Sequence, residues 1–295
     1  MAEFKSGFVA VIGRPNVGKS TLLNSLLQEK ISIVSDKPQT TRNTIQAVLT
    51  RPEGQIVFID TPGIHQPKHK LGEYMVRSAY AVLSEVDLIC FLVDFTDPRT
   101  VDPAIIAALD RTTTPVFLVA NKADLVSAAE QAKFLQAASE QYAFAETLAI
   151  SALDGHGLAD LLSKIFAYLP PGPKYYPDDW LTDHPERFIM AEFIRERILH
   201  HTEDEVPHSV AVDIDEVEND TEKNLVKVRA TIYVERESQK GILIGKNGSM
   251  LKQIGTEARI QIENLLGSKV FLQLWVKVKK DWRNKTGSLS EFGYN

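Results

Sequence analysis

Near its N-terminus the chain reads Gly13-Arg14-Pro15-Asn16-Val17-Gly18-Lys19-Ser20, between an apolar run at residues 8–12 and a helical run at residues 21–27. This order fits the pattern G-x-x-x-x-G-K-[S/T] in the strand-to-helix context that supports it. The two glycines let the backbone turn so that successive N–H groups, as far as Thr21, form a nest for phosphate oxygens. Lys19 is expected to bridge the outer phosphates, and the Ser20 hydroxyl to bind Mg²⁺. The stretch therefore predicts a nucleoside triphosphate site.

The base of the nucleotide is indicated by Asn121-Lys122-Ala123-Asp124, which follows directly on the apolar run 116–120. Loops at the carboxyl ends of parallel strands line the ligand crevice of such folds. The Asp124 carboxylate can accept two hydrogen bonds, and guanine, unlike adenine, offers an N1–H and an N2–H on one edge. Asn121 and Lys122 are expected to hold the loop and cover the base. The segment Ser151-Ala152-Leu153 is expected to supply a backbone N–H for the guanine O6.

A third motif, Asp60-Thr61-Pro62-Gly63, follows the apolar run 56–59. Asp60 is expected to hold Mg²⁺ through water and the Gly63 N–H to reach the γ-phosphate, so that this loop senses whether that phosphate is present. The polar segment 38–44 offers three threonines for the Mg²⁺, of which we favour Thr41. The predicted catalytic residues are Lys19, Thr41 and Gly63, and the predicted metal ligands are Ser20, Thr41 and Asp60.

Up to residue 168, short apolar runs alternate with longer helical ones. Continuously apolar short runs are typical of strands buried on both faces, and their alternation with helices predicts an α/β domain with a mostly parallel sheet and helices on both faces. The single cysteine, Cys90, lies in one of these runs and is expected to be buried. Strands are predicted at 8–12, 56–59, 88–93, 116–119 and 147–150, and helices at 22–27, 71–83, 103–109, 128–138 and 158–168.

The composition is that of an ordinary globular protein, with 295 residues of which 44% are hydrophobic and 24% charged. It excludes a disulfide-dense, collagen-like or wholly disordered chain. No apolar stretch approaches the ~20 residues that span a bilayer, and the first apolar run begins too near Met1 for a cleavable signal to precede it. We therefore expect a cytoplasmic protein.

The nucleotide motifs, in this order, resemble those of the translation-factor-related GTPases, in particular the branch that contains the bacterial ribosome-assembly GTPases. The resemblance covers about residues 7–169 and implies a GTPase that hydrolyses GTP to GDP and phosphate with Mg²⁺. Many signalling GTPases carry a glutamine after the glycine of the third motif, and it orients the attacking water. This chain has Ile64, which cannot hydrogen-bond water, so intrinsic hydrolysis is expected to be slow. Water positioned by backbone groups or by a partner is favoured over catalysis by the adjacent His65.

Beyond residue 169 prolines cluster, which removes backbone donors and favours extended chain. We place a linker at 170–184. The pattern then changes to a helical stretch at 187–200, alternating runs at 210–214 and 226–234, helical stretches at 238–244 and 249–266, and an alternating run at 270–276. This predicts a smaller α+β domain of order α-β-β-α-α-β, with an antiparallel or mixed sheet covered by helices on one face. Phe271 and Trp275 are expected to pack under the helices rather than to stack on bases.

Between the two helical stretches of this second domain lies Gly245-Lys246-Asn247-Gly248. In KH domains such a G-x-x-G loop clamps about four nucleotides of single-stranded nucleic acid, because glycines allow close approach. The chain has a net charge of −6, but residues 240–285 hold ten basic and three acidic residues, whereas residues 200–222 hold nine acidic residues and no Lys or Arg. The loop and its basic surroundings predict an RNA site with contacts from Gly245, Lys246, Asn247, Gly248 and Lys252.

A GTPase domain followed by a type II KH domain is similar, over nearly the whole chain, to one family of bacterial ribosome-assembly GTPases. The resemblance implies binding of the 3′ end of small-subunit (16S) ribosomal RNA and assistance in assembly of the 30S subunit. It also allows a peripheral association with the inner face of the cell membrane, and we expect a monomer. The predicted bounds are 1–169 for the GTPase domain, 170–184 for the linker, 185–281 for the KH-type RNA-binding domain and 282–295 for a C-terminal tail.

Two alternatives stay open at this point. The first is a P-loop ATPase whose C-terminal domain binds a protein, against which Asp124 argues. The second is a membrane-surface regulatory GTPase that uses the basic segment 277–285 as an anchor.

Overall fold

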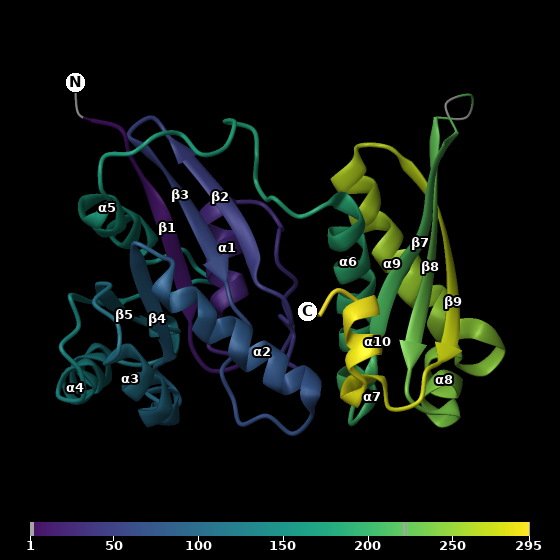
Figure 1. Cartoon of the computed structure of the whole chain (residues 1–295), viewed down its shortest axis with the longest axis horizontal. Coiled ribbons are helices and arrows are strands. Elements are labelled where there is room, and N and C mark those ends of the chain that lie inside the picture. Colours follow the sequence, from purple (N-terminus) through teal and green to yellow (C-terminus); the bar gives the residue numbers. More distant parts are fainter. Residues whose placement is uncertain (1–2, 221, 223, 295) are drawn as a thin grey trace. The chain divides into compact units, whose positions relative to one another are not determined.

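The structure is a computed structural model that describes residues 3–220, 222 and 224–294 (Figure 1). The chain forms two compact units. The first comprises residues up to 34, 41–67 and 75–183, and the second comprises residues 35–40, 68–74 and those from 184 onward. Each unit has a sheet of its own. The outermost residues of the predicted bounds, Met1 and Asn295, lie outside the described residues.

The first unit is built on a six-stranded sheet of order β2-β3-β1-β4-β5-β6. Neighbouring strands are parallel except β2, which runs antiparallel to β3. Consecutive residues of the central strands are buried, which shows that both faces of the sheet are covered. The strands are β1 (Lys5–Ile12), β2 (Ile45–Arg51), β3 (Gly54–Asp60), β4 (Leu88–Asp94), β5 (Val116–Asn121) and β6 (Glu146–Ala149).

The helices of this unit follow the predicted alternation and confirm the mostly parallel α/β fold. Strand β2 has no counterpart in the predicted pattern, because Gln46 and Thr50 interrupt its apolar residues. Cys90 is buried on β4 as predicted, and burial raises the pKa of its thiol to about 12. The helices are α1 (Lys19–Leu27), α2 (Lys70–Ala81), α3 (Pro103–Leu109), α4 (Ala128–Ser139) and α5 (Leu158–Tyr168), with short 3-10 turns η1 (Val82–Ser84), η2 (Pro98–Thr100) and η3 (Ala123–Leu125).

The proline-rich segment expected to be a linker packs along the sheet of the first unit as far as Thr182, and we call residues 170–182 the strap. The Ser6 N–H donates to the Pro170 carbonyl at 3.2 Å, and the Val48 N–H to the Leu181 carbonyl at 2.9 Å. Thr182 forms a bridge with Ala47 on β2. The chain is therefore fixed to the first unit almost to the end of the predicted linker.

The Gln55 side chain holds the middle of the strap. It is fully buried, and its Oε1 accepts the N–H groups of Tyr175 and Tyr176 at 2.8 and 2.9 Å. Its Nε2 donates to the Tyr176 carbonyl and to the Thr50 hydroxyl, both at 2.9 Å. One buried amide thus satisfies three polar groups of the strap and one of β2.

The second unit has a three-stranded sheet of order β7-β8-β9, in which β8 is antiparallel to β7 and parallel to β9. Helices α6 and α9 lie together on one side of this mixed sheet (Figure 1). The predicted order α-β-β-α-α-β is confirmed, and the described part of the unit has two short additional helices, α7 and α10. The elements are α6 (Glu186–His201), α7 (Val206–Ser209), β7 (Ala211–Asp220), β8 (Leu225–Val234), α8 (Glu237–Ile244), η4 (Lys246–Gly248), α9 (Ser249–Leu266), β9 (Lys269–Val278), η5 (Trp282–Asn284) and α10 (Thr286–Glu291).

Two expectations for this unit differ from the structure. The segment expected to be a tail folds back onto the unit, where the Trp282 side chain is fully buried and its Nε1 donates to the Ser209 carbonyl at 2.8 Å. Phe271 and Trp275 do not pack under the helices, since they are 50% and 45% exposed. The alternation along β9 places them on the opposite side of the sheet from the buried Val270 and Val276.

We predict that Gln55→Ala lowers the free energy of unfolding of the chain by about 3 kcal/mol, because two strap N–H groups lose their acceptor and a cavity remains. Chemical denaturation of the whole chain measures the change. The matched control is Tyr176→Phe, which removes one strap bond, from the tyrosine hydroxyl to Gln46 Oε1 at 3.0 Å. This control should lower the free energy of unfolding by about 1 kcal/mol. Equal losses in the two variants would contradict the role given to Gln55.

Candidate functional site

The phosphate loop leaves β1 after Ile12 and enters α1 at Lys19. Gly13 has a φ of +151°, and a Cβ there would lie 2.3 Å from the Leu92 carbonyl oxygen. Gly18 has a φ of +98°, and a Cβ there would lie 2.3 Å from Asn121 Nδ2. Both positions therefore require glycine, for the turn and for close approach.

Lys19 points back into this loop. Its ammonium donates to the carbonyls of Gly13 and Arg14 at 3.3 and 3.0 Å, and the residue is only 6% exposed. Burial lowers the pKa of Lys19 to about 8, against the opposing attraction of the Asp60 carboxylate. The loop thus encloses one cation whose carbonyl partners a phosphate oxygen can replace.

The three predicted metal ligands meet at the start of α1. Ser20 Oγ donates to Asp60 Oδ2 at 2.8 Å and lies 3.0 Å from Thr41 Oγ1. Asp60 is fully buried, and among the described residues its Oδ1 has no hydrogen-bond partner. Burial raises the pKa of Asp60, opposed first by Lys19. Hydroxyl and carboxylate oxygens of this kind suit Mg²⁺, and the neighbouring Thr40 hydroxyl donates elsewhere, to the Lys37 carbonyl.

The third motif lies directly against the phosphate loop. A Cβ at Gly63 would come within 2.7 Å of Pro15 N, and the Ile64 N–H donates to the Gly13 carbonyl at 3.0 Å. The Ile64 side chain is buried in the hydrophobic core, and His65 Nδ1 lies 2.8 Å from the Gly63 carbonyl oxygen. The Ile64 side chain is therefore part of the core.

Asn121 joins the phosphate loop to the loop that follows β6. Its Nδ2 donates to the Val17 carbonyl and its Oδ1 accepts the Ala152 N–H, both at 2.9 Å. Lys122 forms an ion pair with Asp94. Asp124 is exposed, and within the described part of the chain its carboxylate makes neither a hydrogen bond nor an ion pair. A carboxylate without a partner beside a fixed loop is suited to recognise a ligand with two donors.

Other predicted contacts of the nucleotide lie around this frame. The Ser151 N–H donates to the His156 carbonyl and the Ala152 N–H to Asn121, so two of the three backbone N–H groups of the segment expected to contact O6 already have partners in the protein. The Arg14 side chain is engaged within the protein, because its Nη1 donates to the Arg99 carbonyl at 2.9 Å. Its predicted contact with the nucleotide is therefore made by its backbone. The remaining positions are Asn16, which is exposed with a φ of +65°, Thr21 in the first turn of α1, and Leu153, which is 80% exposed.

The predicted RNA contacts lie between α8 and α9. Gly245 has a φ of +70°, and a Cβ there would approach Met250 Cβ to 2.8 Å. Gly248 has a φ of +77°, and a Cβ there would meet no atom of the described residues within 4 Å, so its surroundings are open. Lys246, Asn247 and Lys252 are exposed. The loop therefore presents an open backbone with exposed lysines beside it.

A groove of about 530 Å³ runs from this loop between α9 and β9. Sequence reasoning missed most of its lining. The helix side could have been found from spacing, because residues three, four, seven, eight and eleven positions after Gly248 lie on one face of a helix. The lining includes Gly248, Lys252, Gly255 and Arg259 on α9 and Phe271 and Leu274 on β9.

Known proteins resemble both units. A family model described as a 50S ribosome-binding GTPase matches residues 8–122, and a KH domain model matches residues 205–283. GTPase Era of Carboxydothermus hydrogenoformans is 53% identical over 293 residues, which is 99% of this chain and 98% of that protein. A crystal structure of an Aquifex aeolicus Era variant bound to GDP·AlF4⁻ has a TM-score of 0.95 and 41% identity, with 99% of both chains covered. An Era structure with MgGDPNP and nucleotides 1506–1542 of 16S ribosomal RNA has a TM-score of 0.95, 42% identity and the same coverage.

We predict that Asp124→Asn weakens GTP binding by about 2 to 3 kcal/mol and shifts preference toward xanthosine triphosphate. The aspartate carboxylate has two acceptor oxygens, whereas the asparagine amide has one acceptor oxygen and one donor nitrogen. Calorimetric titration with both nucleotides measures the exchange. Asp154→Asn, an exposed carboxylate of the neighbouring loop, is the matched control and should bind GTP as the parent does. Unchanged GTP affinity in Asp124→Asn would refute the assignment of this loop to the base.

The lowered pKa of Lys19 predicts a pH dependence of nucleotide binding. Phosphate favours the charged ammonium, and a group with a pKa of about 8 loses its proton as the pH rises through that value. Affinity for a non-hydrolysable GTP analogue should therefore fall by about fourfold between pH 7 and pH 8.5, a range below the ionisation of guanine. A series of titrations across this range measures it, and an affinity that stays constant would show that Lys19 remains fully charged in the free protein.

Proposed function

The chain belongs to the Era family of GTPases, and on that premise we propose that it binds GTP and Mg²⁺ in the first unit, binds the 3′ end of small-subunit ribosomal RNA through the second, and assists assembly of the 30S subunit. One observation carries the nucleotide half of this proposal. The hydroxyls of Ser20 and Thr41 converge on the buried Asp60 carboxylate, next to the enclosed Lys19 ammonium.

Each group of the first unit has a role in this proposal. The N–H groups from Gly13 to Thr21 and the Lys19 ammonium bind the phosphates, and Asp124 accepts from the guanine edge. Ser20, Thr41 and Asp60 hold the metal, with Asp60 acting through water. When bound, Mg²⁺ neutralises charge on the β- and γ-phosphate oxygens. The Gly63 N–H contacts the γ-phosphate, and its loop is tied to the phosphate loop by the Ile64–Gly13 bond.

Hydrolysis by this arrangement is expected to be slow. Ile64 stands where a water-orienting glutamine is found in many GTPases, and its side chain is buried in the core. The attacking water is then positioned by backbone groups or by a partner. Because Ile64→Ala would also remove core packing, at a cost of about 2 to 4 kcal/mol, that variant is a poor probe of turnover.

The RNA half of the proposal depends on the loop from Gly245 to Gly248 and on the groove beyond it. Open space around Gly248 lets a phosphate backbone approach, and Lys246 and Lys252 supply charge. The related structure with 16S ribosomal RNA nucleotides supports the choice of partner. We propose Gly245, Lys246, Asn247, Gly248 and Lys252 as the contacts.

For location, we propose a cytoplasmic monomer. None of the described helices has the length and apolarity needed to cross a bilayer. The alternative of a peripheral membrane anchor in residues 277–285 finds less support. Lys279 pairs with Glu291, and Arg283 pairs with Glu235 at 2.6 Å, so that part of this basic charge is neutralised within the protein.

We predict that Gly248→Asp abolishes RNA binding and leaves GTP affinity unchanged, because it puts a negative charge where the RNA backbone approaches. Aspartate tolerates the positive φ, and the open surroundings allow the variant to fold. The test is titration of a labelled 3′-terminal 16S fragment. Binding to the parent should also weaken with salt, with a log–log slope of about −2 to −4 for several phosphate contacts.

The matched control is Gly293→Asp, after α10, where φ is +79° and the surroundings are equally open. It adds the same charge to the same unit without touching the loop, and should bind RNA as the parent does. Parental affinity for RNA in Gly248→Asp would refute the RNA site, and loss of binding in both variants would show a general charge effect.

A further inference from the structure

The sheet of the second unit has an uncovered row of side chains along β9. Lys269, Phe271, Gln273, Trp275 and Lys277 alternate with residues that face the helices, and we call these five residues the β9 row. Val270 and Val276, on the helix side, are 3% and 8% exposed, whereas Phe271 and Trp275 are 50% and 45% exposed. Two aromatic rings are thus about half exposed on an edge strand, so packing in the core does not account for large aromatic side chains at these two positions.

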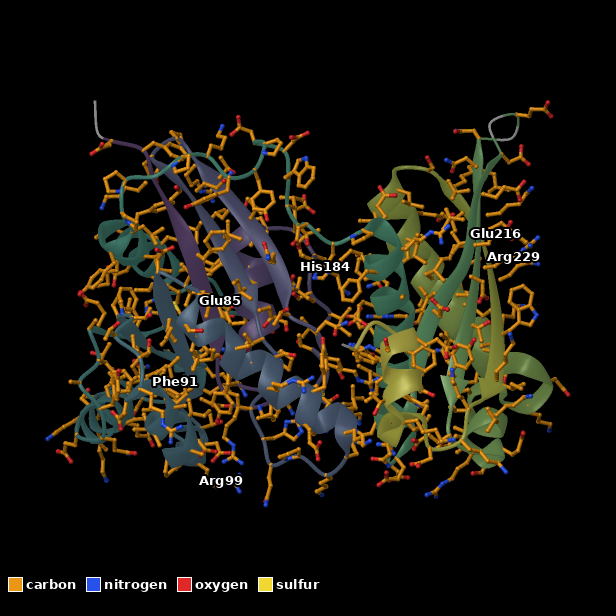
Figure 2. The ribbon with its side chains drawn as sticks, viewed as in Figure 1. Glu85, Phe91, Arg99, His184, Glu216 and Arg229 are labelled. Atoms are coloured by element: carbon orange, nitrogen blue, oxygen red, sulfur yellow. The ribbon has the colours of Figure 1, made fainter. Side chains whose placement is uncertain are left out.

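Charge is distributed unevenly across the same face. On β8, Lys227 lies opposite Phe271 and pairs with Glu218 and Asp220 of β7 at 3.6 and 3.4 Å. Arg229 and Glu216 project together from the sheet side opposite α6 and α9, 2.5 Å apart (Figure 2). The acidic residues of β7 therefore neutralise the basic residues of β8.

The β9 row keeps its charge. Within the described part of the chain, neither Lys269 nor Lys277 forms an ion pair. Gln273 is held in place by its neighbour on β8, since its Oε1 accepts from Arg229 Nε at 3.3 Å. The row is thus a strip with a cation at each end and two rings between them, on either side of a fixed amide.

This pattern suits single-stranded nucleic acid. Flat aromatic side chains serve as stacking platforms for bases, and flanking cations attract the phosphates. Along a strand, residues four positions apart are about 13 Å apart, so that the two rings would receive bases that are not adjacent in the RNA. A protein-binding sheet face would instead present a contiguous apolar centre, which Gln273 interrupts.

The β9 row also continues the groove that begins at the G-x-x-G loop. Phe271 lines that groove together with Gly248, Lys252 and Arg259, while its ring is half exposed. Trp275 does not line the groove. An RNA strand that leaves the groove past Phe271 therefore meets the rest of the row.

We infer that the β9 row is a second surface for single-stranded RNA, on which nucleotides beyond those held in the groove stack on Phe271 and Trp275. The inference rests on the proposed RNA-binding function and adds to it a longer footprint on the same RNA strand. Lys269 and Lys277 contact phosphates at the two ends of this footprint.

The test uses the whole chain and two probes, the 3′-terminal 16S fragment and four-nucleotide pieces of it, which fill the groove alone. Trp275→Ala should weaken binding of the long fragment by about 10-fold and leave binding of the short pieces unchanged. Phe271→Ala should weaken both, because Phe271 lines the groove. Ile260→Ala, an equally exposed apolar residue on α9, is the matched control and should change neither affinity.

Two further variants separate stacking from folding. Trp275→Phe keeps a ring and should retain most of the affinity for the long fragment, whereas Trp275→Leu keeps apolar volume without a ring and should lose it. Equal affinities in these two variants would overturn the inference.

The remaining outcomes are also decisive. Parental affinity for the long fragment in Trp275→Ala, with the short pieces still bound, would overturn the second surface and leave the proposed function standing. Self-association that Trp275→Ala abolishes, with RNA affinity unchanged, would assign the face to a second copy of the chain instead. A parent that binds neither probe would refute the proposed function, and the inference with it.

Discussion

The nucleotide site depends on one buried amide, that of Asn121. Its two ends join the Val17 carbonyl of the phosphate loop to the Ala152 N–H of the loop after β6, and its side chain approaches so closely that Gly18 tolerates no Cβ. Because β1, β5 and β6 are parallel, their carboxyl ends form one edge, and the amide fixes the loops of this edge relative to each other. The proposed phosphate contacts and the proposed base contact, Asp124, are thereby held at a constant separation.

The groups around this amide could be predicted from the sequence, because each belongs to a local pattern. The meeting of Ser20, Thr41 and Asp60 follows from a strand-to-helix loop, a polar segment and a strand end at the same edge of the sheet. Strand β2 and the strap could not be predicted in this way. A buried glutamine such as Gln55 looks like any surface glutamine, since the groups that it satisfies lie about 120 residues away in the chain.

In the second unit the order of elements and the G-x-x-G loop could also be predicted, but burial could not. Alternation along a strand shows that two faces exist, and it does not show which one the helices cover. For this reason the prediction for Phe271 and Trp275 is wrong. The prediction of a C-terminal tail fails because the composition of that segment is polar, although the Trp282 indole is fully buried against the Ser209 carbonyl.

The strap shortens the connection between the two units and so raises their effective concentration relative to each other. The bridge at Thr182 and the start of α6 at Glu186 leave three residues, 183–185, between strap and helix. They span at most about 10 Å. Effective concentration falls roughly as the −3/2 power of tether length, so a connection of three residues in place of about fifteen raises the effective concentration about tenfold. A large ligand with contacts for both units would then bind with an avidity that neither unit has alone.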